Sequence, residues 1–210
     1  MKIAILFSGR ISFFQKSYPN IMENIVQGNE VDFFISYPKD PDINETNAFL
    51  ERFEPKVFME SNESYFYLKP KYNRSRHANY HNMMCMYLNR KNVCELFKKY
   101  IEENNTHYDL VISYRIDYLI SSKLDLNILY EKSNHDQLCI PEGNDYLGLN
   151  DQMALGNMNI MIKYLSCYDS LQNMFEKGTI LHPETILYDY IKLNNIKTFR
   201  FPLKTDIIRK

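Results

Sequence analysis

Tryptophan is absent from the sequence, and the motifs that mark several large enzyme classes are missing too. No GxGxxG or GxxxxGK[ST] segment occurs, which argues against a dinucleotide-binding fold and a P-loop NTPase. No GxSxG elbow or HExxH segment occurs either, so neither a serine hydrolase nor a zinc protease is predicted. The four cysteines are scattered without a CxxC pair, which favours free thiols in a reducing compartment over a disulfide framework or a structural zinc site.

A strong charge of either sign and a long apolar run are also lacking. The net charge is −1, whereas a general nucleic-acid binder needs a basic excess to follow phosphates, so no nucleic-acid partner is predicted. The apolar run Ile3–Phe7 is too brief for a signal-peptide core or a membrane span. We therefore expect a cytoplasmic protein without a membrane span.

The 210 residues fit one domain, 1–210, although the chain could also be one domain of a longer polypeptide. Strand and helix patterns alternate from the start, which predicts an α/β fold with a mostly parallel central sheet flanked by helices. The first predicted elements are strand Lys2–Phe7, a helix from about Ser12 to Val26, strand Val31–Ser36, helix Asn44–Phe53 and strand Lys56–Met59. Pro19 is expected to split the first helix, and Asn44 to cap the second.

An irregular basic and aromatic segment, Glu60–His77, follows; it either closes over a phosphate or base, or is a solvated loop. The later elements are predicted from apolar spacing and turn residues. They are a helix Asn79–Asn104, a strand around Leu110–Ile112, a short helix or turn Leu124–Tyr130, a strand Gln137–Ile140, a turning loop Gly143–Gly156, a helix Asn157–Phe175, a helix from His182 to about Leu193, a strand Ile196–Phe201 and a basic tail Lys204–Lys210.

A glycine turn follows the first predicted strand, with the sequence Ser8-Gly9-Arg10. Such a turn lets backbone amides approach a diphosphate, and Arg10 can clamp it with a bidentate contact. A plain turn with a surface arginine explains the same residues. In the first interpretation the base of a nucleotide lies near Ser8 and Tyr37, and Arg76 of the irregular segment also contacts the nucleotide.

The run Arg115-Ile116-Asp117 directly follows a buried strand. Ligands of open α/β sheets bind beyond the carboxyl ends of the strands, so this position suits a site. The usual metal–diphosphate motif has two acids around one residue; here Arg115 takes the first position. Asp117 can still ligate Mg²⁺ or Mn²⁺ if diphosphate oxygens and water complete the shell, while Arg115 contacts phosphate. The alternative is an Arg–Asp pair that only closes the strand end.

Two later motifs complete the candidate site. Asp151, between Asn150 and Gln152, is suited to orient or deprotonate an acceptor hydroxyl, or the segment is a loop-capping Asx turn. His182, before Pro183, is a candidate metal or phosphate ligand, although a lone histidine is more often structural. Glu184 either serves the same site or favours the start of a helix.

These motifs in this order resemble small GT-A-type glycosyltransferases, in particular those encoded by large DNA viruses of algae, of the chlorovirus type. The resemblance implies a single Rossmann-like domain, a nucleotide-diphosphate sugar donor and a divalent metal, Mn²⁺ or Mg²⁺. It matches Asp117 to the last acid of the Asp-X-Asp motif, Asp151 to an acid near the acceptor, and His182 to a histidine on the metal or diphosphate. The first acid of the motif is replaced by Arg115.

The sequence therefore predicts a glycosyltransferase that moves a hexose or deoxyhexose from a nucleotide-diphosphate sugar to a glycan or glycoprotein acceptor. A UDP-sugar is favoured over a GDP-sugar as the donor. By the viral resemblance its location is the host cytoplasm. Two alternatives stay open. A sugar nucleotidyltransferase shares the fold and metal but normally has a longer, lysine-containing glycine loop. A non-catalytic nucleotide- or carbohydrate-binding module is consistent with the missing first acid.

Overall fold

The computed structural model describes residues 1–39, 43–62 and 79–208, and its centre is a seven-stranded sheet. The strand order across the sheet is β3-β2-β1-β4-β7-β6-β8. The strands are β1 (Lys2–Ser8), β2 (Glu30–Pro38), β3 (Val57–Ser61), β4 (Leu110–Tyr114), β6 (Gln137–Pro141), β7 (Met153–Gly156) and β8 (Lys197–Phe201). A separate two-stranded ribbon joins β5 (Tyr118–Ile120) to β9 (Thr205–Ile207).

The sheet is mostly parallel, with one reversed strand. β1 pairs in parallel with β2 and β4, β2 with β3, and β6 with β8, whereas β7 is antiparallel to both of its neighbours. The pairs Ser8↔Ser36 and Phe7↔Tyr114 bring the carboxyl ends of β1, β2 and β4 to one edge. The Rossmann-like α/β class predicted from the sequence is confirmed.

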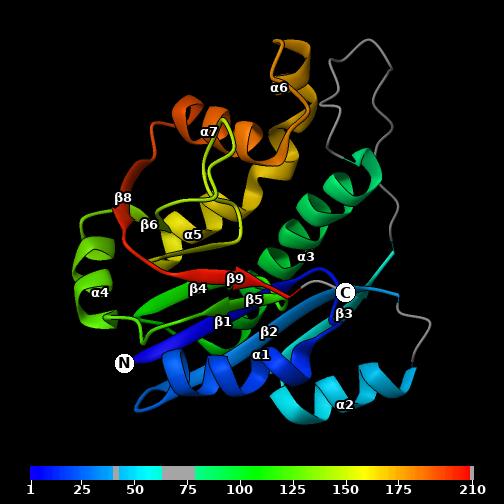
Figure 1. Cartoon of the computed structure of the whole chain (residues 1–210), viewed down its shortest axis with the longest axis vertical. Coiled ribbons are helices and arrows are strands. Elements are labelled where there is room, and N and C mark those ends of the chain that lie inside the picture. Colours follow the sequence, from blue (N-terminus) through cyan, green and yellow to red (C-terminus); the bar gives the residue numbers. More distant parts are fainter. Residues whose placement is uncertain (40–42, 63–78, 209–210) are drawn as a thin grey trace.

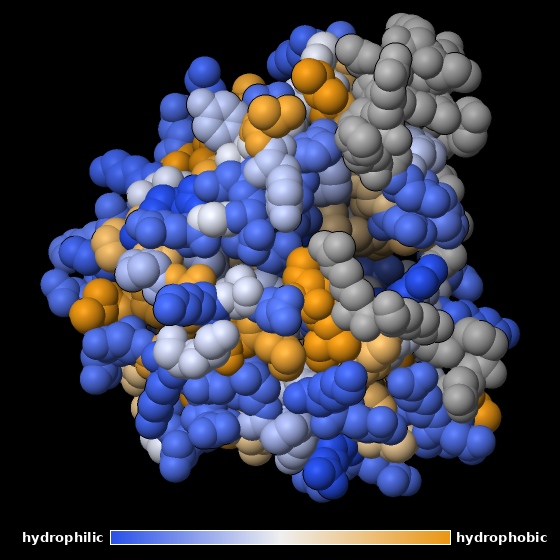
Figure 2. All heavy atoms as spheres, in the orientation of Figure 1, coloured by the Kyte–Doolittle hydropathy of each residue, from blue (hydrophilic) through white to orange (hydrophobic). Residues whose placement is uncertain are grey.

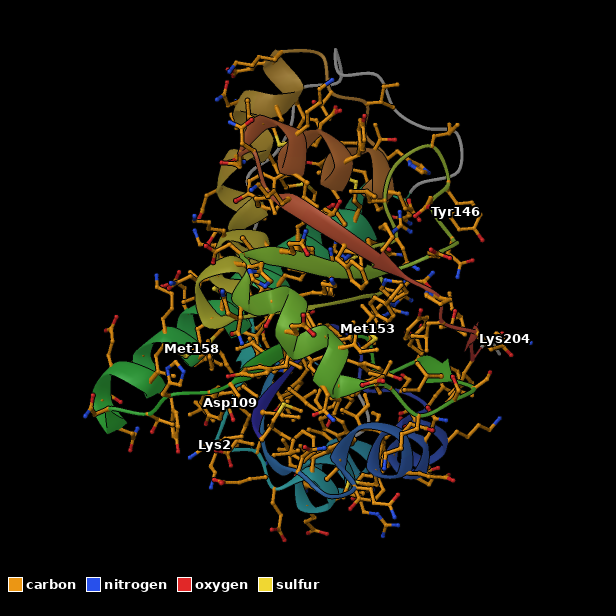
Figure 3. The ribbon with its side chains drawn as sticks, turned by 90° about the vertical axis from the view of Figure 1, so that its left-hand side faces the viewer. Lys2, Asp109, Tyr146, Met153, Met158 and Lys204 are labelled. Atoms are coloured by element: carbon orange, nitrogen blue, oxygen red, sulfur yellow. The ribbon has the colours of Figure 1, made fainter. Side chains whose placement is uncertain are left out.

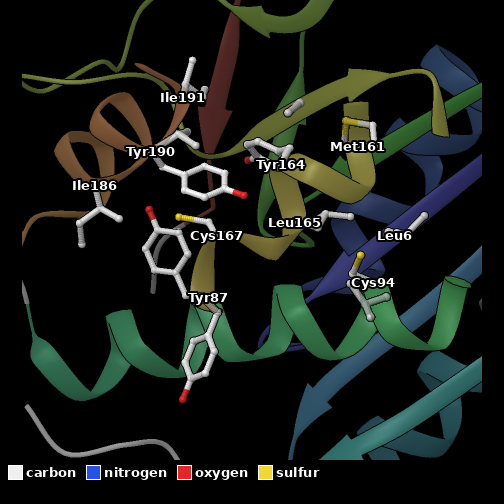
Figure 4. Close-up of a cluster of buried hydrophobic side chains, with 14 of the residues drawn as sticks. Leu6, Tyr87, Cys94, Met161, Tyr164, Leu165, Cys167, Ile186, Tyr190 and Ile191 are labelled. Atoms are coloured by element: carbon white, nitrogen blue, oxygen red, sulfur yellow. The ribbon is translucent and has the colours of Figure 1, made fainter. Parts of the chain in front are cut away.

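Helices cover both faces of the sheet (Figure 1). They are α1 (Phe14–Ile21), α2 (Ile43–Phe53), α3 (Tyr80–Asn104), α4 (Leu126–Asn134), α5 (Met158–Leu165), α6 (Leu171–Glu176) and α7 (Pro183–Leu193). One hydrophobic cluster packs α1, α2 and α4 against one face, and a second packs α3, α5, α6 and α7 against the other. Figure 4 shows side chains of α3, α5 and α7 meeting in the second cluster, among them Tyr87, Tyr164 and Tyr190.

β1 forms at the centre because Ile3–Phe7 is apolar at every position and each of these residues is buried. α3 begins cleanly because the side chain of Asn79 accepts a hydrogen bond from the amide of Asn82 at 3.2 Å. It ends at Asn105, which is left-handed with φ 46°. The polar residues Asn89 and Arg90, which interrupt the predicted apolar face, are both buried within this continuous helix.

Several predicted boundaries are wrong. The first helix begins at Phe14, because Phe13 is left-handed with φ 70°, and Pro19 lies inside α1 without splitting it, before a π-helical turn at Met22–Val26. Asn44 is inside α2 rather than its cap, because the helix starts one residue earlier. Part of the irregular segment, including Arg76, lies outside the described residues.

The second half of the chain differs more from the prediction. The single helix expected over Asn157–Phe175 is divided into α5, a 3-10 turn at Ser166–Ser170 and α6. Strand β7 occupies the end of the predicted glycine-rich loop. Strand β9 occupies part of the predicted basic tail and pairs with β5, and the amide of Ile208 donates to the carbonyl of Asp117 at 2.9 Å. These pairings depend on distant partners that no local pattern reveals.

The surface seen in Figure 2 is mostly hydrophilic, with apolar residues in separate small groups. Among the described residues, no helix is both long and apolar enough to cross a membrane. All four cysteines are buried free thiols. A cavity at the carboxyl edge of the sheet is the candidate site.

Candidate active site

A cavity of about 740 Å³ opens beyond the carboxyl ends of β1, β2 and β4. Its walls are the turn Ser8–Arg10, Pro38, the segment Arg115–Asp117, the first turns of α3 from Asn79, and His182–Glu184 at the start of α7. In Figure 3, Lys2 and Asp109 mark the amino ends of β1 and β4, on the side opposite to Tyr146 and Lys204. The position agrees with the rule that α/β sheets bind ligands past their strand ends.

The turn after β1 supplies an arginine to the rim of the cavity. Gly9 has φ 103°, a conformation that favours glycine, and its amide donates to the carbonyl of Ser36 on β2 at 3.0 Å. This amide is therefore engaged in joining the strands, and the approach of other amides of the turn to a phosphate stays a prediction. Arg10 is exposed and lines the cavity together with half-buried Phe13. The left-handed Phe13 stores backbone strain of the kind found at functional sites.

Arg115 and Asp117 form a side-on pair at the end of β4. The Nε of Arg115 donates to one carboxylate oxygen of Asp117 at 3.0 Å, and a terminal nitrogen donates to the other at 2.7 Å. Both side chains are partly exposed, at 33% and 27%, and both line the cavity. The pair that the sequence left open as an alternative is present, and it places a fixed guanidinium in the wall.

A second Arg–Asp pair lies beneath the first. The antiparallel pairing Tyr114↔Met153 brings the residues before β7 beside those after β4, so Asp151 lies next to the segment Arg115–Asp117 that lines the cavity. A terminal nitrogen of Arg90 lies 3.3 Å from the carboxylate of Asp151 and also donates to its backbone carbonyl. The two side chains are only 3% and 4% exposed. Such a buried pair is costly to break from either side.

Arg90 keeps one nitrogen outside this pair. Its Nη1 is buried and has no hydrogen-bond partner among the described residues, although Arg90 is part of the cavity lining. An arginine in a protein stays charged, and a buried donor without a partner carries a desolvation cost. Arg90 therefore places a buried, charged donor without a partner among the described residues next to the cavity, and such a donor suits an anion.

Two contacts fix the start of α7. The hydroxyl of Tyr87 on α3 donates to the carbonyl of Pro183 at 2.8 Å, and the amide of Leu149 donates to the carbonyl of Glu184 at 3.0 Å. The Nδ1 of His182 lies 3.4 Å from the Glu184 carboxylate and 3.2 Å from the hydroxyl of Thr185. The backbone that carries His182 and Glu184 into the cavity is thus held from two sides.

Glu184 has the altered acidity expected of a proton-transfer group. Burial, and then the negative charge of Asp151, raise its pKa to about 7, although Arg90 and Arg115 act in the opposite direction. Its side chain is 13% exposed. A carboxyl group that is half ionised near neutral pH can take a proton from a hydroxyl and return it.

The sequence matches, over residues 1–205, a protein family described as Domain of unknown function (DUF7796). The chain belongs to this family. No curated protein matches it. Among solved structures it is similar to a protein from Desulfovibrio desulfuricans G20, provisionally described as a nucleotide-diphospho-sugar transferase, with 11% sequence identity and a TM-score of 0.49 over 96% of this chain and 79% of that chain. The link to viral enzymes stays a prediction.

In this DUF7796 protein, most residues singled out from the sequence meet at the cavity. Those that line it are Ser8, Gly9, Arg10, Arg115, Asp117 and His182. Asp151 lies close by but is buried behind Arg90 rather than in the lining. Tyr37 is also outside the lining, because it is 4% exposed and packs in the cluster under α1 and α2, while its neighbour Pro38 faces the cavity.

The side chains present do not fit the predicted Mn²⁺ or Mg²⁺ site. Both carboxylate oxygens of Asp117 already bind Arg115, and the Nδ1 of His182 contacts Thr185 and Glu184, which leaves its Nε2 as the one ring nitrogen that could face a cation. In the described ranges, no three His, Cys, Asp or Glu side chains gather as a ligand set. Hard cations need several oxygen ligands, and this arrangement holds at most one carboxylate for them after a salt bridge opens.

Arg90 was not among the residues singled out, and Glu184 was given no definite role. The signal for Arg90 was the polar stretch Asn89–Asn92 inside an otherwise apolar helix face. Asn89 shares this burial: it accepts a hydrogen bond from Ser36 at 2.9 Å and donates to the carbonyl of Cys85 at 2.8 Å. Polar residues on the buried face of a helix need partners, so such an interruption indicates a polar network.

Proposed function

We propose that this protein is a glycosyltransferase that moves a sugar from a nucleotide-diphosphate sugar, with a UDP-sugar favoured, to a glycan or glycoprotein acceptor. One observation carries the proposal. Arg10, Arg90 and Arg115 line the same cavity as Glu184, a carboxyl group with a pKa of about 7. This combines groups that hold a diphosphate with a group that accepts a proton from a hydroxyl.

In the proposed reaction, the oxygen of an acceptor hydroxyl attacks the anomeric carbon of the donor. The bond from that carbon to the diphosphate oxygen breaks, and the nucleoside diphosphate leaves with the electron pair. Glu184 takes the proton of the hydroxyl, and the guanidinium groups stabilise the charge on the leaving diphosphate. Proton transfer is assigned to Glu184 rather than to Asp151, because Asp151 is buried and paired with Arg90.

The buried pair of Arg90 and Asp151 has a supporting role in this proposal. Asp151 balances the charge of Arg90 and orients it through both the carboxylate and the backbone carbonyl. Asn150 fixes the segment, because its side chain accepts from the amide of Gln152 at 2.9 Å and donates to the carbonyl of Gly143 at 3.0 Å. The Asx turn considered from the sequence is therefore present and holds Asp151 in place.

A screen of donors tests the proposal. The purified protein is incubated with UDP- and GDP-sugars, with and without a mixture of glycan acceptors, and release of UDP or GDP is followed by chromatography. We expect nucleoside diphosphate release that increases when an acceptor is present. Binding of the donors without any release would instead support a non-catalytic module, and pyrophosphate formation from a nucleoside triphosphate would support a nucleotidyltransferase.

The pH dependence of transfer follows from Glu184. Only the ionised carboxylate accepts a proton, so kcat/KM should rise about tenfold per pH unit below pH 7 and level off above it, because the pKa is about 7. Initial rates measured from about pH 5 to pH 9 with the donor identified in the screen give this profile. A rate that is constant across this range would exclude Glu184 as the base.

A further inference from the structure

We propose that the cavity holds the donor diphosphate with the guanidinium groups of Arg10, Arg90 and Arg115, and that these groups take the place of a divalent cation. This inference rests on the proposed function and specifies how the leaving group is bound. It differs from the expectation drawn from the sequence, in which Asp117 and His182 hold Mn²⁺ or Mg²⁺.

The first step of the argument concerns Asp117, the acid expected to hold the metal. Each of its oxygens accepts a bond from Arg115, at 3.0 Å and 2.7 Å, so the guanidinium occupies the bidentate face of the carboxylate and leaves a cation only the outer lone pairs. Arg115 occupies the position of the first acid of the Asp-X-Asp motif. A positive charge therefore stands where the motif places a negative one, and it is fixed in orientation by Asp117.

The second step concerns the floor of the cavity. Arg90 is 3% exposed, and one of its terminal nitrogens is committed to Asp151. The other, Nη1, is buried and has no hydrogen-bond partner in the part of the chain that the structure describes. The guanidinium carbon lies 5.3 Å and 5.9 Å from the ring centres of Tyr87 and Tyr164, so a phosphate oxygen in the cavity reaches this donor after a small shift of the Arg90 side chain. The charge-assisted hydrogen bond formed then removes the cost of the unpaired donor. The donor is built into the fold, because the helix around it is continuous and its partner Asp151 is fixed.

The third step is the balance of charges. Asp117 and Asp151 are each paired with an arginine, so neither carboxylate stands alone toward an anion in the cavity. Arg10 adds an exposed guanidinium at the rim. An incoming diphosphate thus meets three guanidinium groups, two of which are already oriented by their acids. Guanidinium groups bind phosphate oxygens in a planar, bidentate way, so they can neutralise a diphosphate without an ion.

The variant Asp117→Asn separates the two modes of binding. If Asp117 holds a metal, the amide removes the ligand, and UDP affinity should fall about tenfold or more. In our proposal the change removes a negative charge and releases Arg115, so UDP and inorganic pyrophosphate should bind as tightly as to the parent protein or more tightly. Calorimetric titrations with UDP, GDP and pyrophosphate, each in EDTA and in Mn²⁺, measure this.

The variant Arg90→Lys tests the floor of the cavity. Lysine keeps the charge beside Asp151 but has no second planar nitrogen, so we expect UDP and pyrophosphate affinity to fall about tenfold in EDTA. Arg52→Lys is the matched control, since Arg52 is exposed on α2 outside the cavity and stacks over the ring of Tyr18. Thermal unfolding confirms that both variants fold. A folded Arg90→Lys protein with unchanged affinity would overturn the role of Arg90.

The outcomes also separate this inference from the proposed function. UDP binding that appears only with Mn²⁺ and is lost in Asp117→Asn overturns the guanidinium site and leaves the proposed glycosyltransferase standing. If the protein binds none of UDP, GDP and pyrophosphate, either in EDTA or in Mn²⁺, the proposed function itself is overturned. Binding in EDTA that persists in Asp117→Asn and weakens in Arg90→Lys supports both.

Discussion

Replacement of Glu184 by glutamine should lower the rate of sugar transfer by about 10²- to 10⁴-fold, the usual contribution of a general base. The amide has nearly the same shape as the carboxyl group but cannot take a proton from the acceptor. The backbone of Glu184 is fixed by the amide of Leu149, so the helix start should stay in place. Donor affinity should change by less than about threefold, because the arginines are untouched. Steady-state rates and calorimetric binding of UDP measure the two effects separately.

Glu142→Gln is the matched control, because Glu142 is an exposed acid on the connection between β6 and β7 and lies outside the cavity lining. It should transfer sugar at the parent rate. If Glu184→Gln retained parent turnover while Asp151→Asn lost it in a folded protein, the base would be Asp151, as the sequence first indicated. The proposal therefore requires that turnover falls in Glu184→Gln and stays at the parent rate in Glu142→Gln.

Glu184→Gln should raise the stability of the protein at alkaline pH, although it lowers the rate of transfer. Because the pKa of Glu184 is raised from 4.5 to about 7 in the folded protein, the folded state binds the proton more tightly than the unfolded state. Stability from this group is full below about pH 4.5 and is lost as the pH rises through about 7. At pH 8, Glu184→Gln should therefore be more stable than the parent by on the order of 2 kcal/mol, measurable by chemical unfolding.

Gly148→Ala should lower the free energy of unfolding by about 3 kcal/mol or more and reduce transfer as well. A Cβ at Gly148 would lie 1.9 Å from the carbonyl oxygen of Glu184 and 2.5 Å from the amide nitrogen of Thr185. Both are backbone atoms of the first turn of α7, so the helix start must shift to make room. Since that turn carries His182 and Glu184 into the cavity, the shift displaces the proposed base. Urea unfolding and transfer rates of the same preparation measure both losses.

Gly143→Ala is the control within the same loop. Its φ of 81° strains an alanine, but an added Cβ has no atom within 4 Å. It should cost only about 1 kcal/mol and leave transfer unchanged. If both variants lost stability equally and both remained active, the close packing of the loop on α7 would not position the site.

The first half of the fold was predictable because its signals are local. Strands β1 and β2 are apolar runs, and α3 carries its own cap at Asn79. The second half was not, because β7 and β9 depend on partners far along the chain: β7 pairs with β4 and β6, and β9 with β5. A short strand such as Met153–Gly156 looks like part of a glycine-rich loop until its partners are known.

The candidate site shows the same division. The segments after β1 and β4 were found because the carboxyl ends of parallel strands meet at one edge. Sequence order could not show that Arg115 binds Asp117 rather than leaving it free for a metal, because the motif fixes only the spacing of the two residues. Nor could it show Arg90, whose partner Asp151 lies 61 positions further along the chain.

The ribbon of β5 and β9 has a consequence for the order of folding. Residues Tyr118–Ile120 directly follow the Arg115–Asp117 pair, and they gain their partner strand only from Thr205–Ile207. During synthesis, all seven strands of the central sheet emerge before that partner does. Only three residues separate β8, the last strand of the sheet, from β9, so the sheet and the corner beside Asp117 are completed together. Ligand affinity should accordingly appear in the same step as the complete sheet.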